Sequence, residues 1–199
     1  MDNEKQSAAL QIGNPLPTMV FTFTLIVIMI WAVQSGVAGK TGSILLGLFQ
    51  FGCVPGYIAG SVLLFKRGDT LLGNIFLIFT TAFGMIGGLG NFALGIAPFF
   101  GVELDSALTN LPLLWSGLVL VAVCVAFRKA DIPTLIAFAG GAWTLTTGAL
   151  MGLGVIPPVL GGINLVISVC VAVAGFYTVL ADICTMGGVK VPKGPSIAK

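Results

Sequence analysis

Residues 132–181 read IPTLIAFAGGAWTLTTGALMGLGVIPPVLGGINLVISVCVAVAGFYTVLA, a stretch without a single charged side chain. Asp131 and Asp182 bound it on either side. An apolar helix needs about 20 residues to cross a hydrocarbon core about 30 Å thick, so this stretch has room for two membrane spans. The break between them is expected at residues 152–158, where glycines and the pair Pro157-Pro158 disfavour a continuous helix and suit an interfacial turn.

Four more uncharged intervals precede this stretch, and each has room for one span: Lys5 to Lys40, Lys40 to Lys66, Asp69 to Glu103, and Asp105 to Arg128. The 199 residues are 57% hydrophobic and 8% charged, which leaves too little polar surface to cover a water-soluble globule. We therefore expect an all-α membrane protein with one domain over residues 1–199. Its six helices are predicted near 18–38, 43–65, 70–94, 110–127, 132–152 and 159–182.

The distribution of Lys and Arg predicts the orientation, because basic residues near span ends are retained in the cytoplasm. Lys40 is alone on one side of a six-span topology, and the other bases fall on the opposite side: Lys5, Lys66, Arg67, Arg128, Lys129, Lys190, Lys193 and Lys199. Both termini are thus expected in the cytoplasm, with residues 1–13 as an N-terminal segment and 183–199 as a mobile tail. The N-terminal residues lack the plan of a cleaved secretory signal. We expect a multi-pass protein of the plasma membrane.

Several classes of function find no support in the sequence. It has no His, no hydrolase, metalloprotease or phosphate-loop motif, and no pair of carboxylates within a predicted span. Its four Cys form no CxxC pair, and its bases are scattered through loops. The chain is therefore not expected to be an enzyme, to hold a metal or cofactor, or to bind nucleic acid. Six spans without a soluble catalytic domain favour translocation of a solute.

Helices in a membrane associate through small residues that let their backbones approach closely. Gly52, Gly56 and Gly60 repeat every four residues on the second predicted span, and Gly84/Gly88 and Gly148/Gly152 do so on the third and fifth. We interpret these as helix-contact faces, although the same glycines would also suit a widened lumen. The Pro55-Gly56 pair is expected to bend the second span.

The polar residues at membrane depth are uncharged. They are Thr22, Thr24, Gln34, Asn74, Thr80, Thr81, Thr144, Thr146, Thr147, Asn164 and Ser168. Because no Lys or Arg lies among them, hydroxyl and amide donors alone predict weak binding and fast release of an anion. Thr24, Thr80 and Thr144 are candidate substrate-binding residues. Each hydroxyl can instead bond to the backbone of its own helix.

The segment Asn14-Pro15-Leu16-Pro17 stands at the start of the first predicted span. Asn14 can cap this helix, and a Pro in the first turn lacks a donor that would be unsatisfied in any case. Free amides and the positive end of a helix dipole would attract a carboxylate at a pore mouth. A plain interfacial cap is the alternative.

These four residues resemble the Asn-Pro-x-Pro signature of the acetate uptake transporter family, small six-span proteins that carry acetate and, in some members, succinate. Other features follow in the same order: Phe23 nine residues after Asn14, the segment Phe65-Lys66-Arg67-Gly68-Asp69-Thr70 after a Gly-rich second span, and Tyr177 five residues before Asp182. The resemblance covers the chain from Asn14 to Asp182. It implies a homohexamer in which each subunit has its own pore.

The resemblance also implies roles for particular residues. Asn14, Pro15 and Pro17 would form the cytoplasmic entrance, and Phe23 would belong to a hydrophobic constriction. The third span of the family typically adds a Tyr, for which Phe79 and Phe83 are both in register here. A Leu expected from the fifth span falls near Gly140-Gly141, which predicts a wider neck. Thr18-Met19-Val20 replaces the usual Leu-Gly-Leu.

Tyr177 and Asp182 are candidates for the cytoplasmic mouth, where Asp182 would either relay protons or simply meet water and a neighbouring helix end. The function expected from all these features is transport of acetate and related short monocarboxylates, channel-like or proton-coupled. Two alternatives stay open. One is a pore for a neutral solute such as ammonia, urea or undissociated acid, and the other is a membrane subunit that only assembles a complex.

Overall fold

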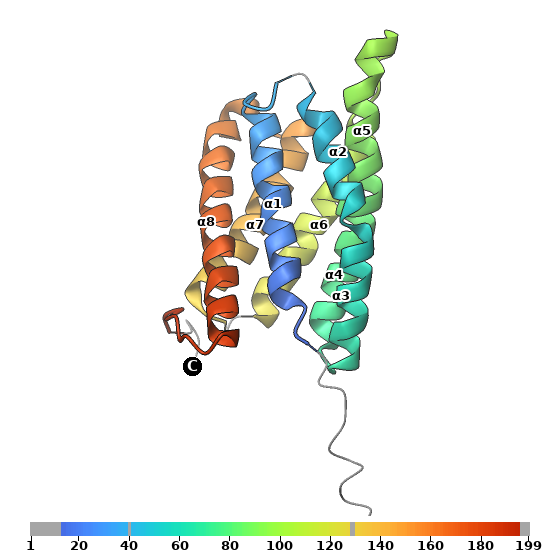
Figure 1. Cartoon of the computed structure of the whole chain (residues 1–199). Coiled ribbons are helices and arrows are strands. Elements are labelled where there is room, and N and C mark those ends of the chain that lie inside the picture. Colours follow the sequence, from blue (N-terminus) through green and yellow to red (C-terminus); the bar gives the residue numbers. More distant parts are fainter. Residues whose placement is uncertain (1–12, 40, 128–129, 196–199) are drawn as a thin grey trace, which may run out of the picture.

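The computed structural model describes residues 13–39, 41–127 and 130–195, so the predicted N-terminal segment and the bases Arg128 and Lys129 lie largely or wholly outside it. Within these ranges every regular element is a helix. Six helical segments are long and apolar enough to cross a membrane: Leu16–Gln34, Gly42–Lys66, Thr70–Phe100, Thr109–Ala126, Ile132–Gly152 and Pro158–Met186. They run alternately up and down in one bundle (Figure 1), which confirms the predicted six-helix architecture.

The first and last spans are single helices that lie side by side: α1 (Leu16–Gln34) and α8 (Gly161–Met186). The start of α1 and the end of α8 lie at the same end of the bundle (Figure 1), here named the terminal end. The opposite end is named the far end. Thr24 on α1 packs against Gly175 on α8, where an added Cβ would come within 3.3 Å of the Thr24 Cβ.

The second span is broken at Cys53 into α2 (Gly42–Gly52) and α3 (Val54–Lys66). Pro55 stands in the first turn of α3, where its missing N–H removes one backbone hydrogen bond of the preceding turn. The predicted bend at Pro55-Gly56 is therefore confirmed, with the break itself placed just before Pro55.

The third span is less regular than the sequence predicts. It consists of α4 (Thr70–Phe79), a π-helix η1 (Thr80–Gly87), α5 (Gly88–Ile96) and a short 3-10 turn η2 (Ala97–Phe100). A π-helical insertion shifts the side chains that follow it and is frequent at functional sites. Two candidate residues, Thr80 and Phe83, lie in this π-helix.

The last three spans follow the predicted boundaries closely. They are α6 (Ala107–Ala126), α7 (Ile132–Gly152) and α8, the last preceded by the 3-10 turn η3 (Pro158–Leu160). The predicted break at residues 152–158 is confirmed. Gly154 adopts φ +70 there, a conformation that favours glycine, and Pro157 is extended.

The closest approach of two helices uses glycines other than those predicted for the second span. An added Cβ at Gly47 would lie 2.6 Å from the Gly88 carbonyl oxygen, and one at Gly95 would lie 2.7 Å from the Ile44 nitrogen, so α2 and α5 touch backbone to backbone. Gly60 packs against Met19. An added Cβ at Gly52 or Gly56 would meet nothing within 4 Å. The proposed ridge of three is thus wrong as a contact face within this chain.

The outer surface of the bundle is apolar. Trp115, Val125, Val166 and Val173 are 64–65% exposed, and many other large hydrophobic side chains are exposed on every span. The interior holds a cluster of aromatic and aliphatic residues around Phe23, Phe76, Phe79 and Phe83. Such a surface would be costly in water and is favourable in lipid, which supports a multi-pass membrane protein.

Candidate functional site

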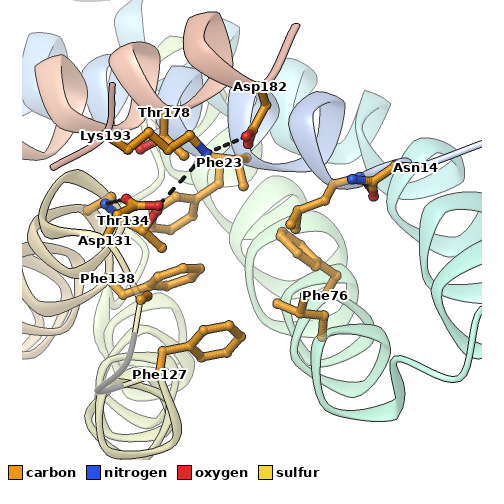
Figure 2. A pocket seen from close by; sticks show the side chains of 15 residues that line it. Asn14, Phe23, Phe76, Phe127, Asp131, Thr134, Phe138, Thr178, Asp182 and Lys193 are labelled. Carbon is orange, nitrogen blue, oxygen red and sulfur yellow. Dashed lines mark hydrogen bonds and ion pairs between the residues drawn. The ribbon is translucent and has the colours of Figure 1, made fainter. Parts of the chain in front are cut away.

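A cavity of about 250 Å³ opens at the terminal end of the bundle, here named the terminal cavity. The helices α1, α4, α7 and α8, the residue Phe127 that follows α6, and the C-terminal tail contribute to it (Figure 2). Its walls are mostly apolar, with Val20, Phe23, Phe76, Phe127 and Phe138 among the lining residues. Its polar groups come from Asn14, Asp131, Thr134, Thr178, Asp182 and Lys193. The lining of the cavity thus combines charged groups with aromatic side chains.

The charged rim is held together by the tail. The Lys193 ammonium donates a hydrogen bond to Asp182 Oδ1, and its Nζ lies 3.9 Å from Asp131 Oδ2. The Tyr177 hydroxyl donates to the Pro192 carbonyl at 2.5 Å. Residues 187–195 lie against α8 and the start of α7, where the Lys193 ammonium group and the Pro192 carbonyl find partners. The mobility of the tail stays a prediction.

Asp182 thus pairs with an ammonium group from the tail, rather than meeting only water or a neighbouring helix end as the structural alternative supposed. The proton-relay alternative stays a prediction. The second carboxylate has two tasks. Asp131 Oδ1 accepts the Thr134 backbone N–H at 3.0 Å and so caps α7, while Oδ2 faces Lys193. Lys193 is therefore a cation in the lining of the terminal cavity, where none was expected from the sequence.

Asn14 is exposed, and its Oδ1 accepts the Leu16 backbone N–H at 3.1 Å, but the N-cap residue of α1 is Pro15, so Asn14 lies one residue before the cap position predicted for it. Its side chain lies across the cavity from Lys193 (Figure 2). Pro15 is half-buried beside it. Pro17 is buried and lines an apolar groove between α1 and α8, together with Phe21 and Phe176. The four-residue motif therefore divides between the cavity and the outside of the bundle.

Phe23, which lines the terminal cavity, packs against two phenylalanines of the third span. The rings of Phe23 and Phe79 are stacked with centroids 5.6 Å apart, and Phe83 lies 6.3 Å from Phe23 and 4.9 Å from Phe79. All three side chains are at most 2% exposed. We name these three residues the phenylalanine plug. Both third-span candidates belong to it, as their spacing of four residues allows.

The fifth span contributes an aromatic ring near this plug. Phe138 lies 6.5 Å from Phe23, and an added Cβ at Gly141 would lie 3.0 Å from Phe23 and 3.3 Å from Leu120. The space in front of Gly141 is therefore filled by two side chains. The wider neck expected from Gly140-Gly141 is not present.

A second cavity of about 110 Å³ lies toward the far end and includes Phe83 in its wall, so it begins where the plug ends. We name it the far cavity. Its polar lining consists of uncharged side chains: Gln34, Gln50, Asn91, Thr109 and Asn110. Asn91 Nδ2 donates to Gln50 Oε1 at 2.8 Å, and Gln50 is 1% exposed. The phenylalanine plug thus lies between the terminal cavity, which has charged groups in its lining, and the far cavity, which is lined by uncharged amides.

The three candidate threonines have different surroundings. Thr24 Oγ1 donates to the Val20 carbonyl and Thr80 Oγ1 to the Phe76 carbonyl, each within its own helix. Thr144 Oγ1 donates to the Gly141 carbonyl at 3.2 Å. Thr144 also borders a gap of about 10 Å³ that shares Gln34, Ile30 and Leu113 with the far cavity. Of the three, Thr144 lies nearest to a solvent-sized space, and Thr24 serves helix packing.

Sequence reasoning missed Lys193, Thr178, Phe138 and the Gln50–Asn91 pair. Lys193 has a signal in the sequence, because a base eleven residues after Asp182 can fold back onto it, but a Gly- and Pro-rich segment lies between them. Gln50 also carries a signal, since an amide within an uncharged span requires a partner. Phe138 is one of many apolar residues on its span and carries none.

No protein-family model matches this chain, and no curated protein matches it. The likeness to acetate uptake transporters therefore depends on the residues quoted from the sequence. What the structure adds is the arrangement of two cavities around the phenylalanine plug.

Proposed function

We propose that the chain conducts acetate and similar short monocarboxylates across the membrane, through a path that joins the terminal cavity to the far cavity. The observation that carries the proposal is the position of the phenylalanine plug, with a cavity on each side of it. Two vestibules separated by a dry constriction are the arrangement of a closed pore. The Asn14 motif at the terminal mouth favours a carboxylate as the solute.

The lining fits weak and rapid passage. Amide and hydroxyl groups can replace water around a carboxylate, and no Lys or Arg is among the described residues that line the far cavity, so none there would hold it tightly. The acetate methyl group suits the apolar walls beside Phe23 and Phe138. Small size and a single charge are therefore the features that the path would select.

The lack of His in the sequence and the position of Asp182 at the rim favour a channel-like mechanism. The chain contains no His, and Asp182 is paired with Lys193 at the rim rather than placed between the cavities. A proton relay requires titratable groups along the path. Acetate would then cross as an anion, with the proton following its own gradient.

The terminal end is proposed to face the cytoplasm. Among the described residues, Lys66, Lys190 and Lys193 lie at this end. Basic residues near span ends are retained on the cytoplasmic side of the membrane. The resemblance extends the proposal to a homohexamer. Gly52 and Gly56 are open on the outer surface, as a contact between subunits would require.

A neutral-solute pore is the second candidate, and the far cavity favours it. Four carboxamides line that cavity without any charge: Gln34, Gln50, Asn91 and Asn110. Such groups hydrogen-bond urea as well as they bond a carboxylate. The two candidate functions differ in the solute that would compete with acetate, which is propionate for the first and urea for the second.

Labelled-acetate uptake into proteoliposomes distinguishes them. We expect saturable acetate entry that propionate inhibits and urea does not. Protein-free liposomes measure the passive entry of undissociated acid. Rapid urea permeation together with acetate entry at the passive rate would contradict the proposal and support the neutral-solute pore.

A further inference from the structure

The hydroxyl group of Thr178, a residue in the wall of the terminal cavity, makes no hydrogen bond to the described residues. Thr178 is 4% exposed, and its Oγ1 has neither a hydrogen-bond partner among the described residues nor contact with solvent. Most Thr hydroxyls in these helices donate to a carbonyl of the preceding turn. A buried hydroxyl without a partner costs about 1–3 kcal/mol, so its place in a cavity wall indicates a ligand that it can bond.

Lys193 lines the same cavity as this hydroxyl. Thr178 and Asp182 are four residues apart on α8 and so lie on one face of the helix, and Asp182 binds Lys193. Figure 2 shows Thr178 beside Lys193, on the side of the cavity opposite Asn14. The Lys193 side chain is 22% exposed, and the residue itself lines the cavity.

The tail holds this cation in place. α8 ends at Met186, and Gly188 with φ +84 reverses the chain, with the Val189 N–H bonded to the Cys184 carbonyl. The Tyr177–Pro192 hydrogen bond then fixes the backbone next to Lys193. Gly194 approaches Ile132 at the start of α7. The tail therefore crosses from α8 toward α7 over the cavity.

The charges at the rim limit how tightly an anion can bind. Among the described residues lining the cavity, two carboxylates, Asp131 and Asp182, face one ammonium group. An incoming carboxylate must compete with Asp182 for Lys193. Removing Lys193 would leave two negative charges facing the solute, while neutralising Asp182 would release the ammonium group.

We propose that Lys193 and Thr178 form a binding site for a small monocarboxylate in the terminal cavity, with the C-terminal tail as an integral part of the pore mouth. This inference rests on the proposed function for the identity of its ligand. The ammonium group contacts one carboxylate oxygen and the Thr178 hydroxyl donates to the other. The apolar wall at Phe23 and Phe138 accommodates the short alkyl group.

Acetate binding to the detergent-purified full chain, titrated by saturation-transfer NMR, tests the site. We expect Lys193→Gln to raise the apparent Kd roughly fivefold, as loss of a partly screened ionic hydrogen bond does. Asp182→Asn is expected to lower the Kd, because it removes the competing carboxylate. Thr178→Val, which keeps the shape of the side chain, is expected to raise it about threefold.

Two controls separate the site from a loosened tail. Lys190→Gln makes the same charge change on an exposed part of the tail, and Tyr177→Phe removes only the hydrogen bond to Pro192. The inference is overturned if wild-type protein binds no acetate, if Lys193→Gln binds like Lys190→Gln, or if Asp182→Asn and Lys193→Gln change the Kd in the same direction. Wild-type binding without acetate flux in proteoliposomes would instead overturn the proposed function and leave the site standing.

Discussion

Replacing Phe23 by Ala is expected to increase acetate flux about tenfold and to reduce discrimination between acetate and longer monocarboxylates. Phe23 is 2% exposed and contacts Phe79, Phe83 and Phe138 through its ring. An anion loses its hydration in such a constriction, and a wider, wetter passage lowers this barrier. A tenfold increase corresponds to about 1.4 kcal/mol of barrier. Initial rates of labelled-acetate uptake in proteoliposomes measure it.

Phe21→Ala is the matched control for this substitution. Phe21 lies on the same helix, is 41% exposed and contacts Phe176 outside the plug. Because truncation of a buried Phe costs about 3–5 kcal/mol of stability, Phe23→Leu serves as a milder variant with an intermediate flux. Folded Phe23→Ala protein that transports acetate at the wild-type rate would show that the plug does not limit passage.

Replacing Gly47 by Leu is expected to lower the stability of the bundle substantially. The α2–α5 contact leaves no space for a side chain, since even a Cβ at Gly47 would lie 2.6 Å from the Gly88 carbonyl oxygen and would press on the Phe92 backbone. Backbone atoms cannot move aside as a flexible side chain can. Overpacking costs about 1–3 kcal/mol or more, which predicts a fall in melting temperature of about 10 °C.

Gly162→Leu on α8 provides the comparison. Gly162 is exposed, and an added Cβ there meets nothing within 4 Å. Its detergent-solubilised melting temperature should stay within about 2 °C of wild type. Equal melting temperatures for the two variants would contradict the close approach of α2 and α5.

The positions of the membrane spans could be predicted because they depend mainly on where charged residues stand in the sequence. Charged residues cannot remain in the hydrocarbon core at low cost, so the intervals between them give the helices, and the proline pair at 157–158 gives the break. The bend at Pro55 follows from the same kind of local rule. These features need no knowledge of which helices are neighbours.

The helix contacts could not be predicted in the same way. The spacing of Gly52, Gly56 and Gly60 is as regular as any in the chain, yet only Gly60 packs against another helix within it. A Gly repeat shows that a face can be approached closely, not which partner approaches it. The π-helix over Thr80–Gly87 was not predicted either, because the sequence pattern of this span gives no sign of it.

The residues of the candidate site likewise fall into those that the sequence predicted and those that depend on the fold. Phe23 and Asn14 were found from the sequence, because a motif and its spacing name them. Lys193 was missed, because its place depends on the turn at Gly188 and on the bond between Tyr177 and Pro192, which bring a tail residue back over the cavity. The charge-free path inferred from the sequence therefore has a cation at its mouth.

Acetate uptake at two values of pH tests the central claim most directly. At about pH 8 a carboxylic acid is almost wholly ionised, so passive entry of the undissociated form is small in protein-free liposomes. The account predicts saturable acetate entry through the wild-type protein that persists at this pH and is inhibited by propionate. Entry that follows the concentration of undissociated acid at both values of pH, at the rate of protein-free liposomes, would contradict it.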